Sequence, residues 1–432
     1  MTARPSLRWW RWLAVALLVM ASLAALVAWL NVRGESPLDA TGTPPGAAAD
    51  AASDAATIQR GAYLARAGNC IGCHTAAGGT ALAGGRGIET PFGTVFASNL
   101  TPDEATGLGR WSAAEFWRAL HHGRSKDGRL LYPAFPYPSF THVTREDAEA
   151  LYAFLRSVPP VRQPNRPHAL RFPYRTQAAL AVWRALFFSP GGLEPEPGRP
   201  AEWQRGRYLV QGLGHCAACH SGRNALGGPG LNAEFAGGLM PDESWYAPSL
   251  ANPAEAGVQR WPQAEVVRLL GAGVSAHGGV AGPMAEVVYG STQHLSPQDL
   301  AAMARYLGAL PEQLAPMPAA KPAPPDQLAR GSNLYKQHCV ACHGEQGQGV
   351  PGIYPPLAGN RAVMLAPPHN LVQSIRKGGF APATAGNPRP FGMPPFGHLL
   401  SDDEVAALAT FLRQAWGHQA PPVSGSEVRR IR

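Results

Sequence analysis

Three short stretches decide the fold: Cys70-Ile-Gly-Cys73-His74, Cys216-Ala-Ala-Cys219-His220 and Cys339-Val-Ala-Cys342-His343. Together they contain all 6 cysteines of the 432-residue chain. Cys-x-x-Cys-His is the attachment pattern of c-type haem, in which both thiols bond the haem and the adjacent His is the proximal iron ligand. A disulfide framework needs no His after every second Cys, and three such copies do not close four-ligand zinc sites. The sequence therefore predicts three covalently bound haem c groups, with iron held by His74, His220 and His343.

Each motif lies inside an internal repeat. A short helical run that opens with Arg-Gly precedes the motif, at Arg60-Gly61, Arg205-Gly206 and Arg330-Gly331. An apolar-periodic helix with an N-terminal capping signature follows it, at Thr144-x-x-Asp147, Ser296-x-x-Asp299 and Ser401-x-x-Glu404. This order of elements resembles the class I cytochrome c fold. We therefore expect an all-α chain with three tandem class I cytochrome c domains after a single N-terminal transmembrane helix.

Composition predicts the boundaries. Gly and Pro, at 49 and 43 residues, are concentrated in loops and connections. The expected segments are a membrane anchor (1–33), a flexible tether (34–56), domain one (57–160), an Arg/Pro-rich connection (161–200), domain two (201–314), a Pro-rich spacer (315–325), domain three (326–418) and a disordered basic tail (419–432). Apolar residues between 176 and 188 predict a short helix in the connection, which packs on the chain's own domains or docks on a partner.

The N-terminus indicates export. No charged residue occurs from Trp12 to Leu30, a length that nearly crosses a bilayer. Arg4, Arg8 and Arg11 precede this stretch, so the positive-inside rule places the N-terminus in the cytoplasm. We expect an anchor in the inner (cytoplasmic) membrane with the haem domains in the periplasm. A cleaved signal peptide is the alternative, and it exports the same domains.

Charge excludes one class of partner. The formal net charge is +8, but charged residues make up only 15% of the chain. No segment has the Lys/Arg density or the interleaved aromatic residues of a nucleic-acid surface. The excess of basic residues is better explained by solubility and by attraction to an acidic partner or to anionic lipid.

Methionines near the capped helices are candidate sixth ligands of the iron. Met393 lies eight residues before Ser401, and Met284 lies twelve residues before Ser296. A thioether opposite His is the ligand set typical of high-potential cytochromes c. The other methionines of these two domains, Met240, Met303 and Met364, do not take the same position before a cap.

Domain one has no methionine between its motif and its cap, and Phe135 stands in the corresponding segment. A phenyl ring cannot bond iron. Three alternatives follow for the first haem: a His of domain one, with His121 and His122 equally supported; a Met lent by another domain; or an open sixth position. A structural role is favoured for His142.

Longer stretches resemble one family. They are GRGIETPFGTVFASNLTPDEATGLGRWSAAEFWRALHHG, LYPAFPYPSFT, WYAPSL and GPMAEVVYGSTQHLS. Over residues 57–415 the chain resembles the membrane-bound triple-haem cytochrome c subunit of bacterial dehydrogenases, whose partners are quinoprotein alcohol, flavin-dependent gluconate or sorbitol, and molybdenum-containing aldehyde, nicotinate or isoquinoline oxidoreductases. The resemblance implies that a separate catalytic subunit oxidises the substrate, while this chain passes electrons to ubiquinone or a terminal oxidase. Phe135 departs from the family, which often has Met there.

The residues themselves favour the same class. The chain offers no dinucleotide-binding fingerprint, nucleophile elbow or paired carboxylates, so we expect no dehydrogenase activity from it alone. An electron-transfer subunit is the first hypothesis. A haem c subunit of a terminal oxidase and a peroxidase-like haem enzyme are the alternatives.

Overall fold

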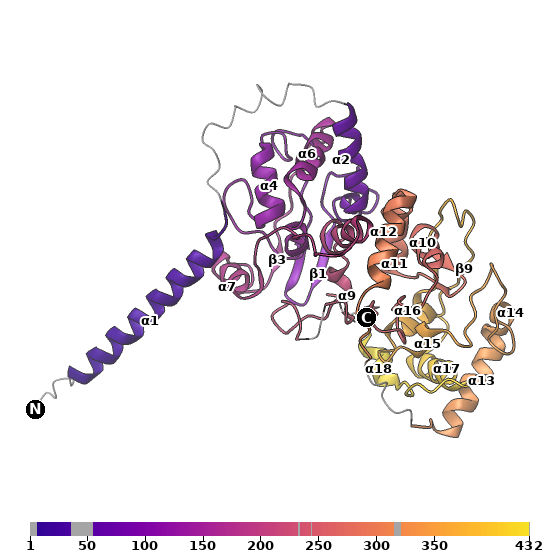
Figure 1. Cartoon of the computed structure of the whole chain (residues 1–432). Helices are drawn as coiled ribbons and strands as arrows, with labels where there is room; N and C mark the ends of the chain where they lie inside the picture. The colour runs from indigo at the N-terminus through magenta and orange to yellow at the C-terminus, as the bar shows by residue number, and fades with distance from the viewer. Residues whose placement is uncertain (1–6, 36–54, 232–233, 243, 315–320, 432) are drawn as a thin grey trace, which may run out of the picture.

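The computed structural model describes residues 7–35, 55–231, 234–242, 244–314 and 321–431 (Figure 1). Most of the expected tether and the first part of the spacer lie outside these residues. We call the three repeats unit one (57–160), unit two (201–314) and unit three (326–431). The helix α1 (Leu7–Val32) projects away from all three (Figure 1).

Each unit has the predicted order of elements. In unit one these are α2 (Ala55–Ala67), α3 (Cys70–Cys73), α4 (Ala113–His122), α5 (Tyr137–Phe140) and α6 (Arg145–Ser157). In unit two they are α8 (Ala201–Arg207), which continues into a π-type turn (Tyr208–Leu213), α9 (Ala217–His220), α10 (Gln263–Ala272), α11 (Pro283–Gly290), a 3₁₀ turn (Thr292–His294) and α12 (Pro297–Gly308). In unit three they are α13 (Pro325–His338), α14 (Val340–His343), α15 (Arg361–Met364), α16 (His369–Lys377), α17 (Asp402–Gln414) and α18 (Gly425–Arg430).

The all-α expectation needs a correction, because short antiparallel strands occur in every unit. Strands β1 (Gly87–Thr90), β2 (Gly93–Phe96) and β3 (Ala169–Leu170) form one sheet. The two-stranded pairs are β4 (Gly238–Leu239) with β5 (Tyr246–Ala247), β6 (Val274–Ser275) with β7 (Gly278–Gly279), and β8 (Gly379–Phe380) with β9 (Gly392–Met393). Most of these strands are two residues long and Gly-rich, so they show no alternation of apolar and polar residues from which a strand could be predicted. The chain is mostly helical, with hairpins in its loops.

The Arg-Gly repeat fixes how the first and last helices of each unit cross. A Cβ on Gly61, Gly206 or Gly331 would overlap the backbone carbonyl of Ala150, Ala302 or Ala407 on the facing helix, so only glycine permits the close crossing. The preceding arginine pairs with the acidic third residue of that facing helix. The pairs are Arg60–Asp147 at 2.6 Å, Arg205–Asp299 at 2.7 Å and Arg330–Glu404 at 3.2 Å.

The predicted N-caps are confirmed, and they place those acids. The hydroxyls of Thr144 and Ser296 accept the backbone N–H of Asp147 and Asp299 at 3.2 and 3.1 Å, and Ser401 accepts that of Glu404 at 3.4 Å. Each acid therefore sits at the positive end of its own helix and faces the arginine of the opposite helix.

Units one and two exchange a pair of hydrogen bonds. Tyr63 of unit one donates to Asp299 of unit two at 2.6 Å, and Tyr208 of unit two donates to Asp147 of unit one at 2.5 Å. These tyrosines occupy the same place in the repeat, two residues after the glycine. Consequently one hydrophobic core contains buried side chains of both units, among them Leu64, Leu151, Leu155, Leu209, Leu213, Val266 and Met303.

Unit three has its own core and docks on unit two. Asn333 stands where the other units have the tyrosine, so the exchange is not repeated. Instead, Asn370 exchanges two hydrogen bonds with the backbone of Tyr246, at 2.9 and 2.8 Å. Arg361 donates to the carbonyl of Pro253 at 2.6 Å. This contact is made mainly to backbone groups and leaves the two cores separate.

The prediction of a disordered tail from 419 to 432 is wrong for its described residues. Ser424 caps α18, and Val423, Val428 and Ile431 are buried in the core of unit three. Arg376 donates to the carbonyl of Ile431 at 2.7 Å. Three apolar residues among arginines show no helical period, but they cover a core that would otherwise face water.

The helix expected in the connection is confirmed as α7 (Gln177–Phe187), and it packs on the end of α1 (Figure 1). Asn31 donates to the carbonyl of Ala181 at 2.8 Å and accepts from the buried Arg184 at 2.9 Å. Arg184 also donates to the carbonyl of His122 at 2.6 Å. The C-terminal end of α1 is thereby joined to unit one.

Replacing the crossing glycine tests this packing. We expect Gly206→Ala to lower the free energy of unfolding by about 1–3 kcal/mol, because the added methyl forces α8 and α12 apart. Gly308→Ala is the matched control: a Cβ there meets nothing within 4 Å, so we expect no loss. Denaturant titration of the haem-loaded chain measures both, and equal effects would contradict the close crossing.

The exchanged tyrosines are tested by removing one oxygen atom. Tyr63→Phe and Tyr208→Phe each take a donor from a buried carboxylate, which costs about 1.5–3 kcal/mol for a hydrogen bond to a charged group. Tyr289→Phe, at an exposed side chain, is the control. Thermal unfolding followed by circular dichroism should show lower midpoints for the first two variants only.

Candidate functional site

The cysteine pairs lie on one short helical turn each, and a spacing of three residues puts both sulfurs on the same side of that turn. No disulfide joins any of the six. Burial raises the pKa of Cys70 and of Cys216 to about 12, and that of Cys339 to about 11. Burial therefore disfavours the thiolate form of these three cysteines.

The histidine of each motif is oriented through its Nδ1. This atom lies 2.7 Å from the carbonyl oxygen of Ser98 in His74, 2.7 Å from that of Pro248 in His220, and 3.1 Å from that of Pro355 in His343. A carbonyl can only accept, so Nδ1 carries the hydrogen and Nε2 keeps its lone pair. Burial lowers the pKa of all three, which favours the neutral ring. A neutral imidazole held through Nδ1 is the form that ligates a metal.

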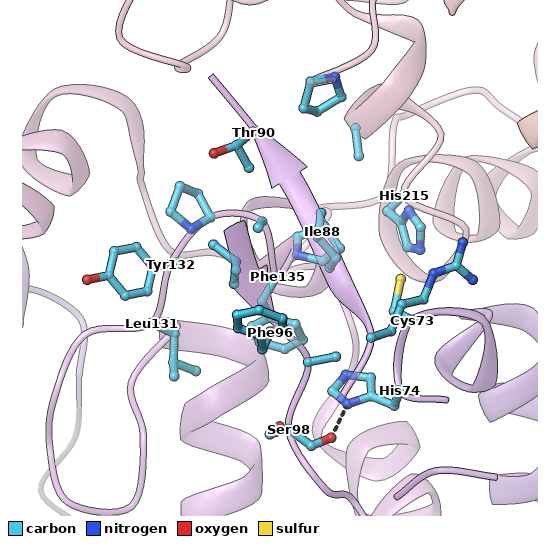
Figure 2. A pocket seen from close by; sticks show the side chains of 18 of the residues that line it. Cys73, His74, Ile88, Thr90, Phe96, Ser98, Leu131, Tyr132, Phe135 and His215 are labelled. Carbon is cyan, nitrogen blue, oxygen red and sulfur yellow. Dashed lines mark hydrogen bonds between the residues drawn. The ribbon is translucent and has the colours of Figure 1, made fainter. Parts of the chain in front are cut away.

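A large cavity adjoins the first motif. Its volume is about 2800 Å³, whereas pockets for one small molecule span about 300–1,000 Å³. Its wall contains Cys73 and His74 from the first motif and Cys219 from the second. Figure 2 shows His74 held by Ser98 and turned into this space. The donor set, the neutral imidazole and the size of the cavity all fit a covalently attached haem.

The two predicted thioether ligands lie at hairpins in their units, Met284 after one and Met393 at the end of one. Met284 lies at the start of α11 after β6 and β7, and Met393 ends β9. Both are half-buried and contact the core of their unit. Their role as iron ligands stays a prediction. Met303 of α12 is buried in the core that units one and two share.

Neither His121 nor His122 belongs to the described wall of the large cavity. His121 stacks on Trp117 with ring centroids 4.4 Å apart, and burial lowers the pKa of each histidine to about 4. His142 is also outside that wall, and its Nδ1 lies 2.9 Å from the carbonyl of Gly191. The structural role expected for His142 agrees with this contact.

Three further imidazoles and one thioether on the described wall were not predicted as ligands from the sequence. They are His168 from the connection, His215 and His294 from unit two, and Met240 after β4. No spacing relative to a motif singles them out, because they come from other parts of the chain. An ion pair also crosses between units here: Arg86 lies 3.2 Å from Glu286 and donates to the carbonyl of Gly72 beside Cys73.

The cytochrome c family model matches the chain three times, at residues 58–159, 204–311 and 328–416. The chain belongs to the cytochrome c family. It is 40% identical over 405 residues to the cytochrome c subunit of the alcohol dehydrogenase (quinone) of Gluconacetobacter polyoxogenes, covering 88% of this chain and 85% of that one.

Two further relatives of this cytochrome c have different names. The gluconate 2-dehydrogenase cytochrome c subunit of Pantoea cypripedii is 37% identical, with 89% of this chain and 92% of that one covered. A nicotinate dehydrogenase subunit of Pseudomonas putida is 41% identical over 98% of this chain but only 35% of its own length. The resemblance noted in the sequence is therefore confirmed: the chain is similar to cytochrome c subunits of several dehydrogenases.

Proposed function

We propose that this cytochrome c is a triple-haem electron-transfer subunit, which receives electrons from a periplasmic dehydrogenase and passes them to ubiquinone. The dehydrogenase is a separate catalytic subunit of the quinoprotein, flavoprotein or molybdenum type. Haem iron supplies the one-electron redox chemistry when bound. The protein supplies attachment, orientation of the axial histidines and exclusion of water.

The observation that carries the proposal is the position of the first two motifs. Cys73 and Cys219 lie in the wall of one cavity, although 146 residues separate them in the sequence. The shared core and the exchanged tyrosines hold the two units in a fixed relation. Two attachment sites at one cavity support transfer of single electrons from one unit to the other.

The cavity also supports a membrane quinone as the acceptor. Its wall continues from His74 to the α7 residues Ala179, Trp183 and Leu186. Because α7 packs on the C-terminal end of α1, this wall lies where an anchored α1 would leave the bilayer (Figure 1). Within the helix Trp9–Val32, a stretch of 18 residues has a mean hydropathy of 2.6. None of this stretch is buried, as expected for a segment that spans a membrane. A terminal oxidase is the alternative acceptor.

Exposed apolar side chains in unit three are the surface on which we expect the catalytic subunit to bind. Phe380 and Phe391 are 71% and 54% exposed near Met393. The ring centroids of Phe391 and Tyr354 are 5.4 Å apart, and Tyr354 lies close to Cys342 of the third motif. The strand β9 next to this surface lies beside α10 of unit two and away from α1 (Figure 1). Electrons would then enter at unit three and leave at unit one.

The number of haems is measured on the unfolded chain. Thioether-linked haem survives denaturation, so mass spectrometry of protein matured in its native host should show three haem additions. The variant Cys339→Ala/Cys342→Ala should show two. Fewer than three in the unaltered chain, with a motif cysteine free, would overturn the assignment.

The division of labour is tested by reconstitution. The isolated full chain should show no haem reduction with alcohols, aldehydes or sugar acids, and should become reduced when the co-purifying catalytic subunit and its substrate are added. Phe391→Asp should slow this reduction, whereas Leu314→Asp, at a position that is also exposed, should not. Substrate-driven reduction of the chain alone would contradict the proposal.

The acceptor is tested by narrowing the cavity beside α7. In vesicles that contain ubiquinone, Ala179→Trp should slow quinone reduction while leaving haem reduction by the partner unchanged. Ala362→Trp, at a position in unit three outside the cavity wall, is the control. Unchanged quinone reduction in the first variant would contradict this route and favour the oxidase.

A further inference from the structure

Unit one differs from units two and three at the position where those units have Met284 and Met393. In all three units a helix (α4, α10 or α16) is followed by an antiparallel pair, and one residue after this pair, or at its end in unit three, precedes the capped last helix. The antiparallel pairs are the bridge Arg124–Leu130 in unit one, β6–β7 in unit two and β8–β9 in unit three. The residues at this place are Phe135, Met284 and Met393. The common topology places Phe135 where the other two units carry a thioether.

Phe135 is fixed in that place by aromatic packing. Its ring lies 5.3 Å from that of Phe140 and 6.4 Å from that of Tyr137, centroid to centroid. Phe135 and His74 belong to the wall of the same cavity, and Figure 2 shows both side chains at this space. A phenyl ring donates no lone pair to a metal and no hydrogen bond to a ligand.

The other imidazoles on the described wall each have one ring nitrogen in a hydrogen bond. His168 lies 3.1 Å from the backbone N–H of Phe96 through its Nδ1, which must therefore accept, so its Nε2 carries the proton. His215 and His294 direct Nε2 at the carbonyls of Gly68 and Tyr289, at 3.4 and 3.2 Å, so Nε2 carries the hydrogen and only Nδ1 keeps a lone pair. Met240 is the one thioether among the described wall residues.

We propose that the haem at the first motif has no side-chain ligand opposite His74, and that this apolar face binds a small neutral ligand of the carbon monoxide class. The proposal rests on the proposed function, because it requires haem at Cys70 and Cys73. Phe135 lines this space and its ring has no hydrogen-bond donor, so the space would suit a neutral diatomic molecule better than a peroxide, whose cleavage needs polar distal groups.

Spectroscopy of the full chain reads the ligands directly. Near-infrared magnetic circular dichroism of the oxidised protein should show the His/Met band for two haems of three. Carbon monoxide added to the reduced protein should alter the spectrum of one haem in three. Three His/Met equivalents, a bis-His band, or no response to carbon monoxide would each overturn the proposal.

One substitution should give the haem of unit one the His/Met ligation expected in units two and three. Phe135→Met should raise the His/Met signal from two equivalents to three and abolish carbon monoxide binding. Phe135→Leu keeps an apolar side chain without a ligand atom, so it should retain carbon monoxide binding and separate ligation from packing. Met393→Phe, the reciprocal change, should create a second haem that binds carbon monoxide.

Two further variants address ligands from elsewhere. Met240→Leu and His168→Gln should leave the spectra unchanged, and loss of a low-spin signal in either would overturn the proposal. The haem count keeps the two proposals apart. Three haem additions together with three His/Met equivalents would defeat only this inference, whereas a missing haem at Cys70 would defeat the proposed function.

Discussion

The structure depends on a carboxylate at the third position of the last helix in each unit. In unit one the side chain of Asp147 is 3% exposed and its carboxylate accepts from the guanidinium of Arg60 and from the hydroxyl of Tyr208 of unit two. The backbone N–H of Asp147 donates to the hydroxyl of Thr144 at the cap. A buried charge is tolerated only when its hydrogen bonds are satisfied. The same group therefore closes its own unit and joins it to the next.

That dual use explains why two units merge and the third does not. Asp299 repeats the arrangement with Arg205 and Tyr63, so the exchange is reciprocal. In unit three Glu404 pairs with Arg330 and Ser401 alone among the described residues, and Asn333 replaces the tyrosine. With no partner carboxylate to reach, unit three closes its own core with α18 and docks through Asn370 and Arg361. The difference in one side chain thus separates a shared core from a surface contact.

Much of this could be predicted from the sequence, and the reason is local. The motifs, the caps and the apolar stretch of α1 each lie within a few consecutive residues, where spacing alone reports the chemistry. Contacts between distant segments could not be predicted. The Arg-Gly repeat was visible, but its role depends on the helix crossing, which brings Arg60 to Asp147. The cavity wall likewise combines His168, His215 and Met240 from segments with no common pattern. The tail was misjudged because burial of Val428 depends on the core it covers.

Phe135 stands in place of a methionine in the unit that lies next to α1, and this position has a consequence for electron transfer. Unit one is the unit joined to α1, through Arg184 and Asn31, and its cavity reaches α7. A thioether opposite the axial histidine favours reduced iron, so the unit that lacks one is expected to hold its electron less tightly than its sisters. In a chain whose electrons leave beside the membrane, a weakly held electron at the exit favours transfer onward. Under the proposed ligation and route, the haem that adjoins the anchor would hold its electron less tightly than the other two, which would favour its transfer onward.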